Sequence, residues 1–133
     1  MEKEGIGKKI LIVEDKEDSR ILLRKILMHR GYVIIEAGTG EDAINMAKAE
    51  LPDLILMDVR LPGAIDGLEA TRQIKALPNL ANVPILAVTA SVRPEDIKRA
   101  LGEGCSGFIR KPIDIDELPI KVAEYIVNTS SKD

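Results

Sequence analysis

The chain has 133 residues, about the size of one domain. Hydrophobic residues make up 45% of it and charged residues 31%, a composition that can form one buried core and argues against general disorder. Nineteen Lys and Arg against 22 Asp and Glu give a net charge of −3, and only three residues are aromatic, so direct nucleic-acid binding is disfavoured. The single cysteine excludes an internal disulfide and a Cys-rich zinc site. A charged N-terminus and the lack of a run of about 18 apolar residues predict a cytoplasmic protein without membrane contact.

The first half of the chain alternates short apolar runs with segments of helical repeat. Strands are predicted at residues 9–13, 32–37 and 53–58, and helices at 21–28 and 41–51. Asp18 or Ser19 is the expected cap of the first helix, and Gly31 its end. Thr39 is the expected start signal of the second.

The second half continues the alternation. Helices are predicted at residues 67–77, at 94–101 and from Asp114 onward, and strands at 84–89 and 107–110. Pro94 suits the first helical position, and Pro119 is tolerable because it falls in the first turn. Leu118, Val122, Tyr125 and Ile126 would form the apolar stripe of the last helix.

Strands that alternate with helices and are nearly unbroken in apolar character indicate a parallel sheet covered on both faces. We therefore predict five βα units in a three-layer α/β sandwich. The whole of 1–133 is read as one domain, with a core at about 9–127 and terminal tails at 1–8 and 128–133.

Polar residues follow four of the predicted strands. Glu14 and Asp15 follow the first strand, Asp58 ends the third, Thr89 ends the fourth, and Lys111 follows the fifth. The carboxyl ends of parallel strands meet at one edge, which is where ligands bind in such sheets. Three carboxylates, a hydroxyl and an ammonium should therefore converge there.

Three neighbouring carboxylates repel one another unless a proton or a cation joins them. Hard oxygen ligands of this number suit Mg²⁺. An aspartate on a strand end beside a metal and a lysine is typical of carboxylates that accept phosphoryl groups. Taken singly, each residue has a plainer interpretation: a solvated acidic turn for Glu14 and Asp15, a loop cap for Asp58, and a surface lysine for Lys111.

From about residue 9 to 127, the chain resembles the response-regulator receiver domains of two-component and phosphorelay signalling. The motifs that carry the resemblance are ILIVED from residue 10, GYVIIEAGTGEDAI from 31, PDLILMDVRLP from 52, AVTA from 87 and GCSGFIRKPI from 104. Each motif is modest, but five in the right order are specific. The resemblance implies the flavodoxin-like (βα)5 fold with strand order 2-1-3-4-5.

The resemblance also assigns roles. Asp58 would accept a phosphoryl group from a histidine kinase or a histidine phosphotransfer protein, and Thr89 and Lys111 would contact the phosphoryl oxygens. Mg²⁺ would be held by Glu14, Asp15, Asp58 and the backbone carbonyl of Arg60. The chain would then be a signalling domain and not an enzyme, apart from slow autodephosphorylation.

The family's switch and partner face maps onto Thr89, Ala90, Ser91 and Phe108, within a contact surface spanning residues 93–125. Because Phe108 lacks a hydroxyl, a switch there must work through burial and rotamer packing, and the alternative is a core residue that does not move. The chain would either bind a downstream protein target in its phosphorylated state or relay the phosphoryl group onward to a histidine phosphotransfer protein.

Two features depart from the family pattern. Four residues, 63–66, separate Pro62 from Gly67 where three are usual, which predicts a different loop shape and puts partner fit there in question. Arg60 and Ser91 occupy positions at which the family tunes the lifetime of the phosphate.

Two other functions fit the sequence less well, and a third remains open. Haloacid-dehalogenase-like phosphatases carry an Asp-x-Asp motif, but here Arg60 stands where the second Asp of that motif would be. A flavin or nucleotide carrier needs a phosphate cradle after the first strand, where this chain has acidic residues. A receiver fold that acts as a protein-interaction module without phosphorylation remains the open alternative.

Overall fold

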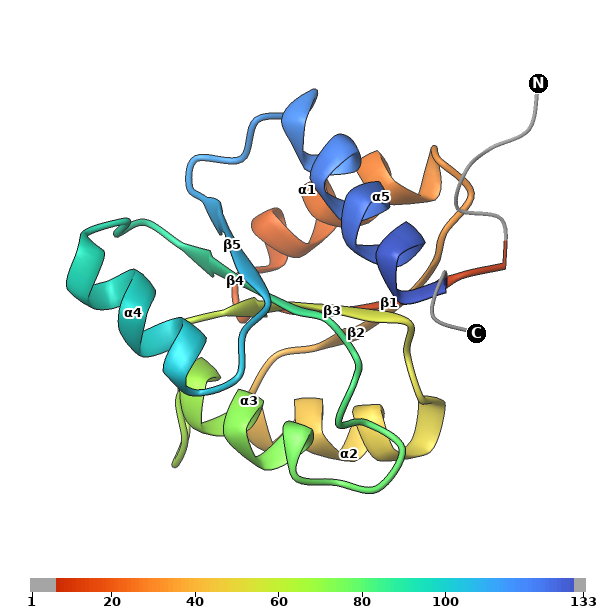
Figure 1. The fold of residues 1–133 in the computed structure, drawn as a ribbon. Helices are drawn as coiled ribbons and strands as arrows, with labels where there is room; N and C mark the ends of the chain where they lie inside the picture. The colour runs from red at the N-terminus through yellow and green to blue at the C-terminus, as the bar shows by residue number, and fades with distance from the viewer. Residues whose placement is uncertain (1–6, 131–133) are drawn as a thin grey trace.

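The computed structural model describes residues 7–130, with side chains through residue 126. Five parallel strands in the order β2-β1-β3-β4-β5 form a single sheet between two layers of helices (Figure 1). The strand order and the three-layer arrangement agree with the fold predicted from the sequence.

The elements alternate strictly along the chain. The strands are β1 (Lys9–Val13), β2 (Val33–Ala37), β3 (Leu54–Asp58), β4 (Ile85–Thr89) and β5 (Gly107–Arg110). The helices are α1 (Glu17–Met28), α2 (Gly40–Glu50), α3 (Gly67–Lys75), α4 (Pro94–Gly102) and α5 (Glu117–Ser130). Each predicted strand differs from the observed one by at most one residue at its start.

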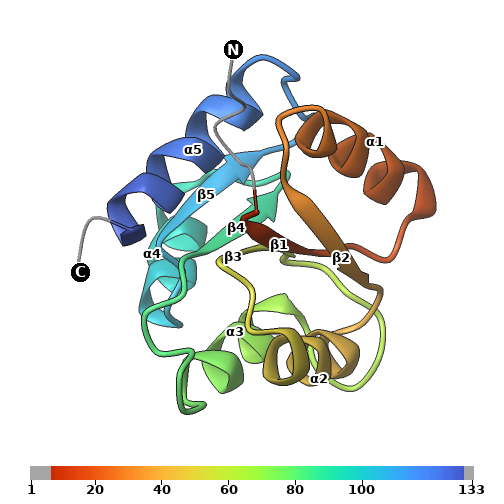
Figure 2. The same ribbon diagram turned by 90° about the vertical axis from the view of Figure 1, so that its right-hand side faces the viewer.

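Two separate cores lie on the two faces of the sheet. Helices α1 and α5 cover one face, and α2, α3 and α4 cover the other (Figure 2). Leu11 and Val13 of β1 face the second group of helices, whereas Ile10 and Ile12 face the first. Successive residues of a strand point to opposite faces, so a strand that is covered on both sides must be apolar at every position.

Strand register brings the carboxyl ends together. Val13 lies beside Met57 in β3, and Asp58 lies beside Val88 in β4. The residues that follow β1, β3 and β4 therefore emerge at the same edge of the sheet.

The start of α1 differs from the prediction, in which Asp18 or Ser19 was the cap. The helix begins at Glu17, and Lys16 occupies the cap position without a side-chain cap bond. Glu14 accounts for the difference, since its Oε2 accepts a hydrogen bond from the Lys16 amide and turns the chain directly into the helix. In α2, by contrast, the Thr39 hydroxyl accepts a bond from the Asp42 amide, as expected of the start signal.

Helix α5 is longer than predicted. Asp114 accepts hydrogen bonds from the amides of residues 116 and 117, and Pro119 falls in the first turn. The helix continues through Ser130, beyond the predicted end of the core at about 127, and no Gly or Pro interrupts residues 120–130. Residues 1–6 and 131–133 of the predicted tails lie outside the described part. Within residues 7–130, no helix is long and apolar enough to cross a bilayer.

Candidate functional site

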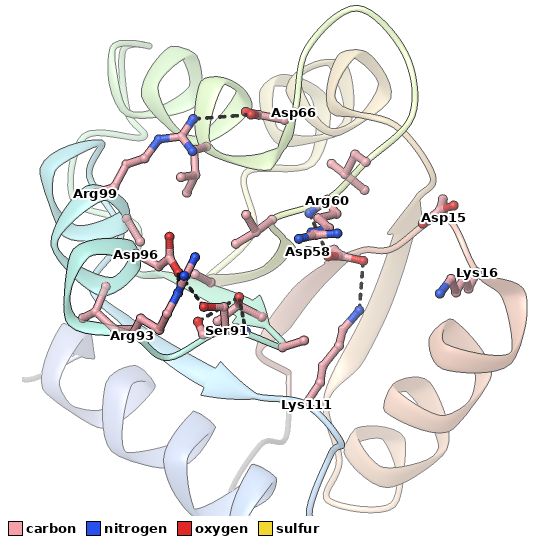
Figure 3. A pocket seen from close by; sticks show the side chains of 18 of the residues that line it. Asp15, Lys16, Asp58, Arg60, Asp66, Ser91, Arg93, Asp96, Arg99 and Lys111 are labelled. Carbon is pink, nitrogen blue, oxygen red and sulfur yellow. Dashed lines mark hydrogen bonds and ion pairs between the residues drawn. The ribbon is translucent and has the colours of Figure 1, made fainter.

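A groove of about 920 Å³ opens at the carboxyl edge of the sheet (Figure 3). Asp15, Asp58, Thr89 and Lys111 all contribute to its wall, and it continues toward α4. Four of the five side chains predicted to converge on this edge therefore line one groove. Glu14, the fifth, lies behind them and contacts Lys111.

The end of β1 delivers two acids with different surroundings. Glu14 is buried, with 1% exposure, and its amide donates to the carbonyl of Ala37 in β2. Its Oε1 accepts from Lys111 Nζ at 3.1 Å, and its Oε2 accepts from the Lys16 amide at 3.1 Å. Asp15 is exposed and lines the groove. Glu14 is thus held in place by hydrogen bonds to both carboxylate oxygens, whereas Asp15 is open to solvent.

Asp58 ends the central strand β3 and is buried, with 4% exposure. Its Oδ1 accepts from the Arg60 amide at 3.0 Å, and its Oδ2 accepts from Lys111 Nζ at 3.1 Å. Gly67, the first residue of α3, packs tightly behind it: a Cβ on Gly67 would lie 2.0 Å from the Asp58 carbonyl oxygen. The Arg60 amide and the Lys111 ammonium therefore orient this carboxylate, and the close approach of Gly67 fixes the backbone that carries it.

Lys111 joins the two buried carboxylates. Its amide donates to the Thr89 carbonyl at 2.8 Å, which fixes the residue beside the end of β4, and the following bond to Pro112 is cis. Burial alone would lower the pKa of Lys111, but hydrogen bonds and attraction to Asp58 and Glu14 outweigh burial, so the pKa is raised. The lysine therefore stays an ammonium and serves as the internal counter-ion of the site.

The carboxylates of Glu14, Asp15 and Asp58 fit a divalent cation. One oxygen from each lies within 4.8 Å of the others. All three are hard oxygen donors, which suits Mg²⁺ better than softer metals. Since one lysine cannot neutralise three carboxylates, an added cation would relieve their repulsion. The structure describes the amide of Arg60 on Asp58, and a role for the Arg60 carbonyl as a ligand stays a prediction.

Thr89 is half-buried at the end of β4, and its hydroxyl is engaged locally. It donates to the Ser91 carbonyl at 3.1 Å and accepts from the Ser91 amide at 3.1 Å. The Ser91 hydroxyl in turn donates to the Asp96 carboxylate. Ala90, between Thr89 and Ser91, is exposed. A phosphoryl contact by Thr89 would require this turn to rearrange.

Phe108 is partly buried against the core beneath α2, α3 and α4. The ammonium of Lys121, on α5, lies 5.0 Å from the centre of its ring, a cation–π distance. Sequence reasoning missed this partner because it lies 13 residues away on another element, with no local motif to mark it.

The four-residue loop before α3 is held by its neighbours. The Ala64 amide donates to Glu41 Oε2 at 3.1 Å, and Asp66 caps α3 by accepting from the Glu69 amide at 2.9 Å. Asp66 also pairs with Arg99 of α4 at 3.6 Å, across the groove (Figure 3). The loop therefore ends at Asp66, which both caps α3 and pairs with Arg99.

Comparisons with known proteins agree with this geometry. Residues 10–123 match the family model of the response regulator receiver domain. The polar-differentiation response regulator DivK of Brucella ovis is 36% identical over 119 residues, which cover 90% of this chain and 96% of the relative.

Solved structures are similar as well. One of them is the receiver domain of a sensor histidine kinase from Pseudomonas aeruginosa, which holds a magnesium ion coordinated in its active site cleft. It superposes with a TM-score of 0.83 at 35% identity, covering 90% of this chain and 98% of the other. The chemotaxis protein CheY4 of Vibrio cholerae superposes with a TM-score of 0.85 at 25% identity, covering 89% and 98%.

Proposed function

Because the chain belongs to the response regulator receiver domain family, we propose that it accepts a phosphoryl group on Asp58 from a histidine kinase or histidine phosphotransfer protein and signals through protein contacts. One observation carries the proposal: Asp58 is a buried carboxylate on a strand end, it shares an ammonium with Glu14, and it lies beside the exposed Asp15. This combination suits an aspartate that must receive an anion.

In the proposed reaction, a carboxylate oxygen of Asp58 attacks the phosphorus of a phosphohistidine. The new O–P bond forms as the P–N bond breaks, and the imidazole nitrogen keeps the electron pair. Lys111, already 3.1 Å from Asp58, would bind a phosphoryl oxygen as a point charge. The Thr89 hydroxyl would exchange its bond to Ser91 for a second phosphoryl oxygen.

The proposed cofactor is Mg²⁺, held by Glu14, Asp15, Asp58 and the carbonyl of Arg60. When bound, it would neutralise negative charge on the carboxylates and on the incoming phosphoryl group. The oxygen atoms within 4.8 Å of one another support this assignment. The magnesium described in the Pseudomonas aeruginosa receiver domain supports it by analogy.

Phosphorylation would be read out on the surface near Thr89, Ala90, Ser91 and Phe108. Movement of Thr89 toward the phosphate would release its turn with Ser91, and Phe108 would repack in response. The output is proposed to reach a downstream protein target or a phosphotransfer protein.

Intact-mass measurement tests the proposal. The full chain is incubated with a small acyl phosphate and Mg²⁺, and the wild type should gain one phosphoryl group, whereas EDTA should prevent the gain. Asp58→Asn should gain none, and Asp116→Asn, at an exposed position on another loop, should behave as the wild type. An unmodified wild type, or a modified Asp58→Asn, would favour the phosphorylation-independent interaction module instead.

A further inference from the structure

Arg20 of α1 donates hydrogen bonds to the main-chain carbonyls of Glu14 and Asp15, the two acids that follow β1. Helix α1 lies next to β2 (Figure 2). We propose that Arg20, anchored by Glu36, is a positioning residue for the metal site: it fixes the main chain of Glu14 and Asp15 so that their carboxylates face Asp58. The inference rests on the proposed function, because it concerns the same Mg²⁺ site.

The contacts of Arg20 divide between its two kinds of nitrogen. Nη1 donates to the Glu14 carbonyl at 2.9 Å and to the Asp15 carbonyl at 3.3 Å. Nε donates to Glu36 Oε1 at 3.1 Å, and the other oxygen of Glu36 accepts from Arg24 Nη1 at 2.6 Å. Glu36 lies on β2, beside Ile12 of β1. A chain of ion pairs thus ties α1 and β2 to the carbonyls of the two acids.

The two acids depend on Arg20 to different degrees. Glu14 is also held by Lys111, by the Lys16 amide and by its own amide bond to β2. In the described chain, Asp15 has no comparable set of bonds to its carboxylate, which is exposed, and it meets Arg20 through its carbonyl. Loss of Arg20 would therefore free mainly Asp15, the acid most available to a metal ion.

The role is geometric and not one of charge. Arg20 bonds the main-chain carbonyls of Glu14 and Asp15, and its other partner is Glu36, a carboxylate that it shares with Arg24. The guanidinium can hold Glu36 with Nε while Nη1 holds both carbonyls, because its nitrogens are fixed in one plane. A lysine at this position has one nitrogen and cannot fill both tasks in the same geometry.

The test measures Mg²⁺ affinity directly, from amide chemical shifts of the full chain titrated with MgCl₂. Arg20→Met should weaken the binding about tenfold, as is typical when a group that orients metal ligands is lost. Arg20→Lys keeps the charge and should be weakened to a similar extent. The matched control is Arg72→Met, which removes an exposed arginine paired with Glu69 on α3 and should bind as the wild type.

The outcomes separate the two proposals. If the wild type binds no Mg²⁺, the proposed function fails and this inference with it. If the wild type binds and Arg20→Met binds equally well, the positioning role alone is overturned; the same holds if Arg20→Lys restores full affinity, since charge would then suffice. Should Arg20→Met not fold, Arg20→Lys and Glu36→Gln carry the test, and wild-type affinity in both would overturn the role.

Discussion

Replacing Lys111 by methionine would remove the positive charge that Glu14 and Asp58 share. Each carboxylate oxygen lies 3.1 Å from Nζ, and at an effective dielectric constant of about 20 each attraction is about 5 kcal/mol before the cost of desolvation. Desolvation offsets most of that gain in the wild type. The variant nevertheless keeps two nearly buried carboxylates without their counter-ion, and removing one partner of a buried pair costs about 3–5 kcal/mol.

The lower end of that range applies here, because the Lys111 side chain is 26% exposed and water can reach the site. We therefore expect Lys111→Met to lower the free energy of unfolding by about 3 kcal/mol, which for a domain of this size lowers Tm by about 10 °C. The methylene stem of lysine is largely kept by methionine, so the loss reports on charge and not on packing.

Thermal unfolding followed by circular dichroism in EDTA would measure this effect. Lys98→Met, at an exposed position on α4, is the control and should stay close to the wild type. Added Mg²⁺ should raise the Tm of Lys111→Met more than that of the wild type, since a cation would supply the missing charge. A variant as stable as the wild type in EDTA would refute the assignment of Lys111 as the internal counter-ion.

Three further outcomes follow from packing around the site. Gly67→Ala should lower the free energy of unfolding in urea by about 3 kcal/mol, because the added Cβ would lie 2.0 Å from the Asp58 carbonyl oxygen. The control is Gly102→Ala in α4, where the added Cβ would have no atom within 4 Å and the change should be neutral or stabilising. Equal stabilities of the two variants would contradict the close approach at Gly67. Burial raises the pKa of Cys105, so the native thiol should resist iodoacetamide at pH 8 and react in denaturing urea, and rapid native alkylation would contradict its burial. Phe108→Ala should leave acyl-phosphate labelling of Asp58 within twofold while weakening phosphorylation-dependent amide shifts in α4, and unchanged shifts would remove Phe108 from the switch.

Most of the architecture was predictable because a parallel sheet constrains sequence strongly. Apolar positions on both faces of β1 and β3 require a layer on each side of the sheet, and the helical segments between the strands supply both layers. Once the strands are assigned, their carboxyl ends must share an edge, so the convergence of Asp15, Asp58 and Lys111 follows from topology without any distance information.

Details that depend on contacts between distant segments could not be read in the same way. The cap of α1 was mispredicted because Glu14, a residue assigned to the metal site, also bonds the Lys16 amide. No sequence motif singles out Arg20, and its bond to the Glu14 carbonyl forms only when α1 is packed beside the end of β1. The bond of the Thr89 hydroxyl to the Ser91 carbonyl likewise has no sequence signal, and contact of this hydroxyl with a phosphoryl oxygen stays a prediction.

The proposed function requires a buried aspartate to accept an anion, and the charge of the site sets the condition for this. Glu14, Asp15 and Asp58 carry three negative charges and Lys111 one positive charge, so the protein alone leaves two negative charges at the groove. An anionic phosphoryl group would be repelled from such a site. A divalent cation would bring the site to neutrality without displacing Lys111, which remains available to bind the transferred group. Under the proposed function the tasks divide: Glu14 keeps Lys111 in place, Asp15 offers an open ligand, and Asp58 acts as the nucleophile.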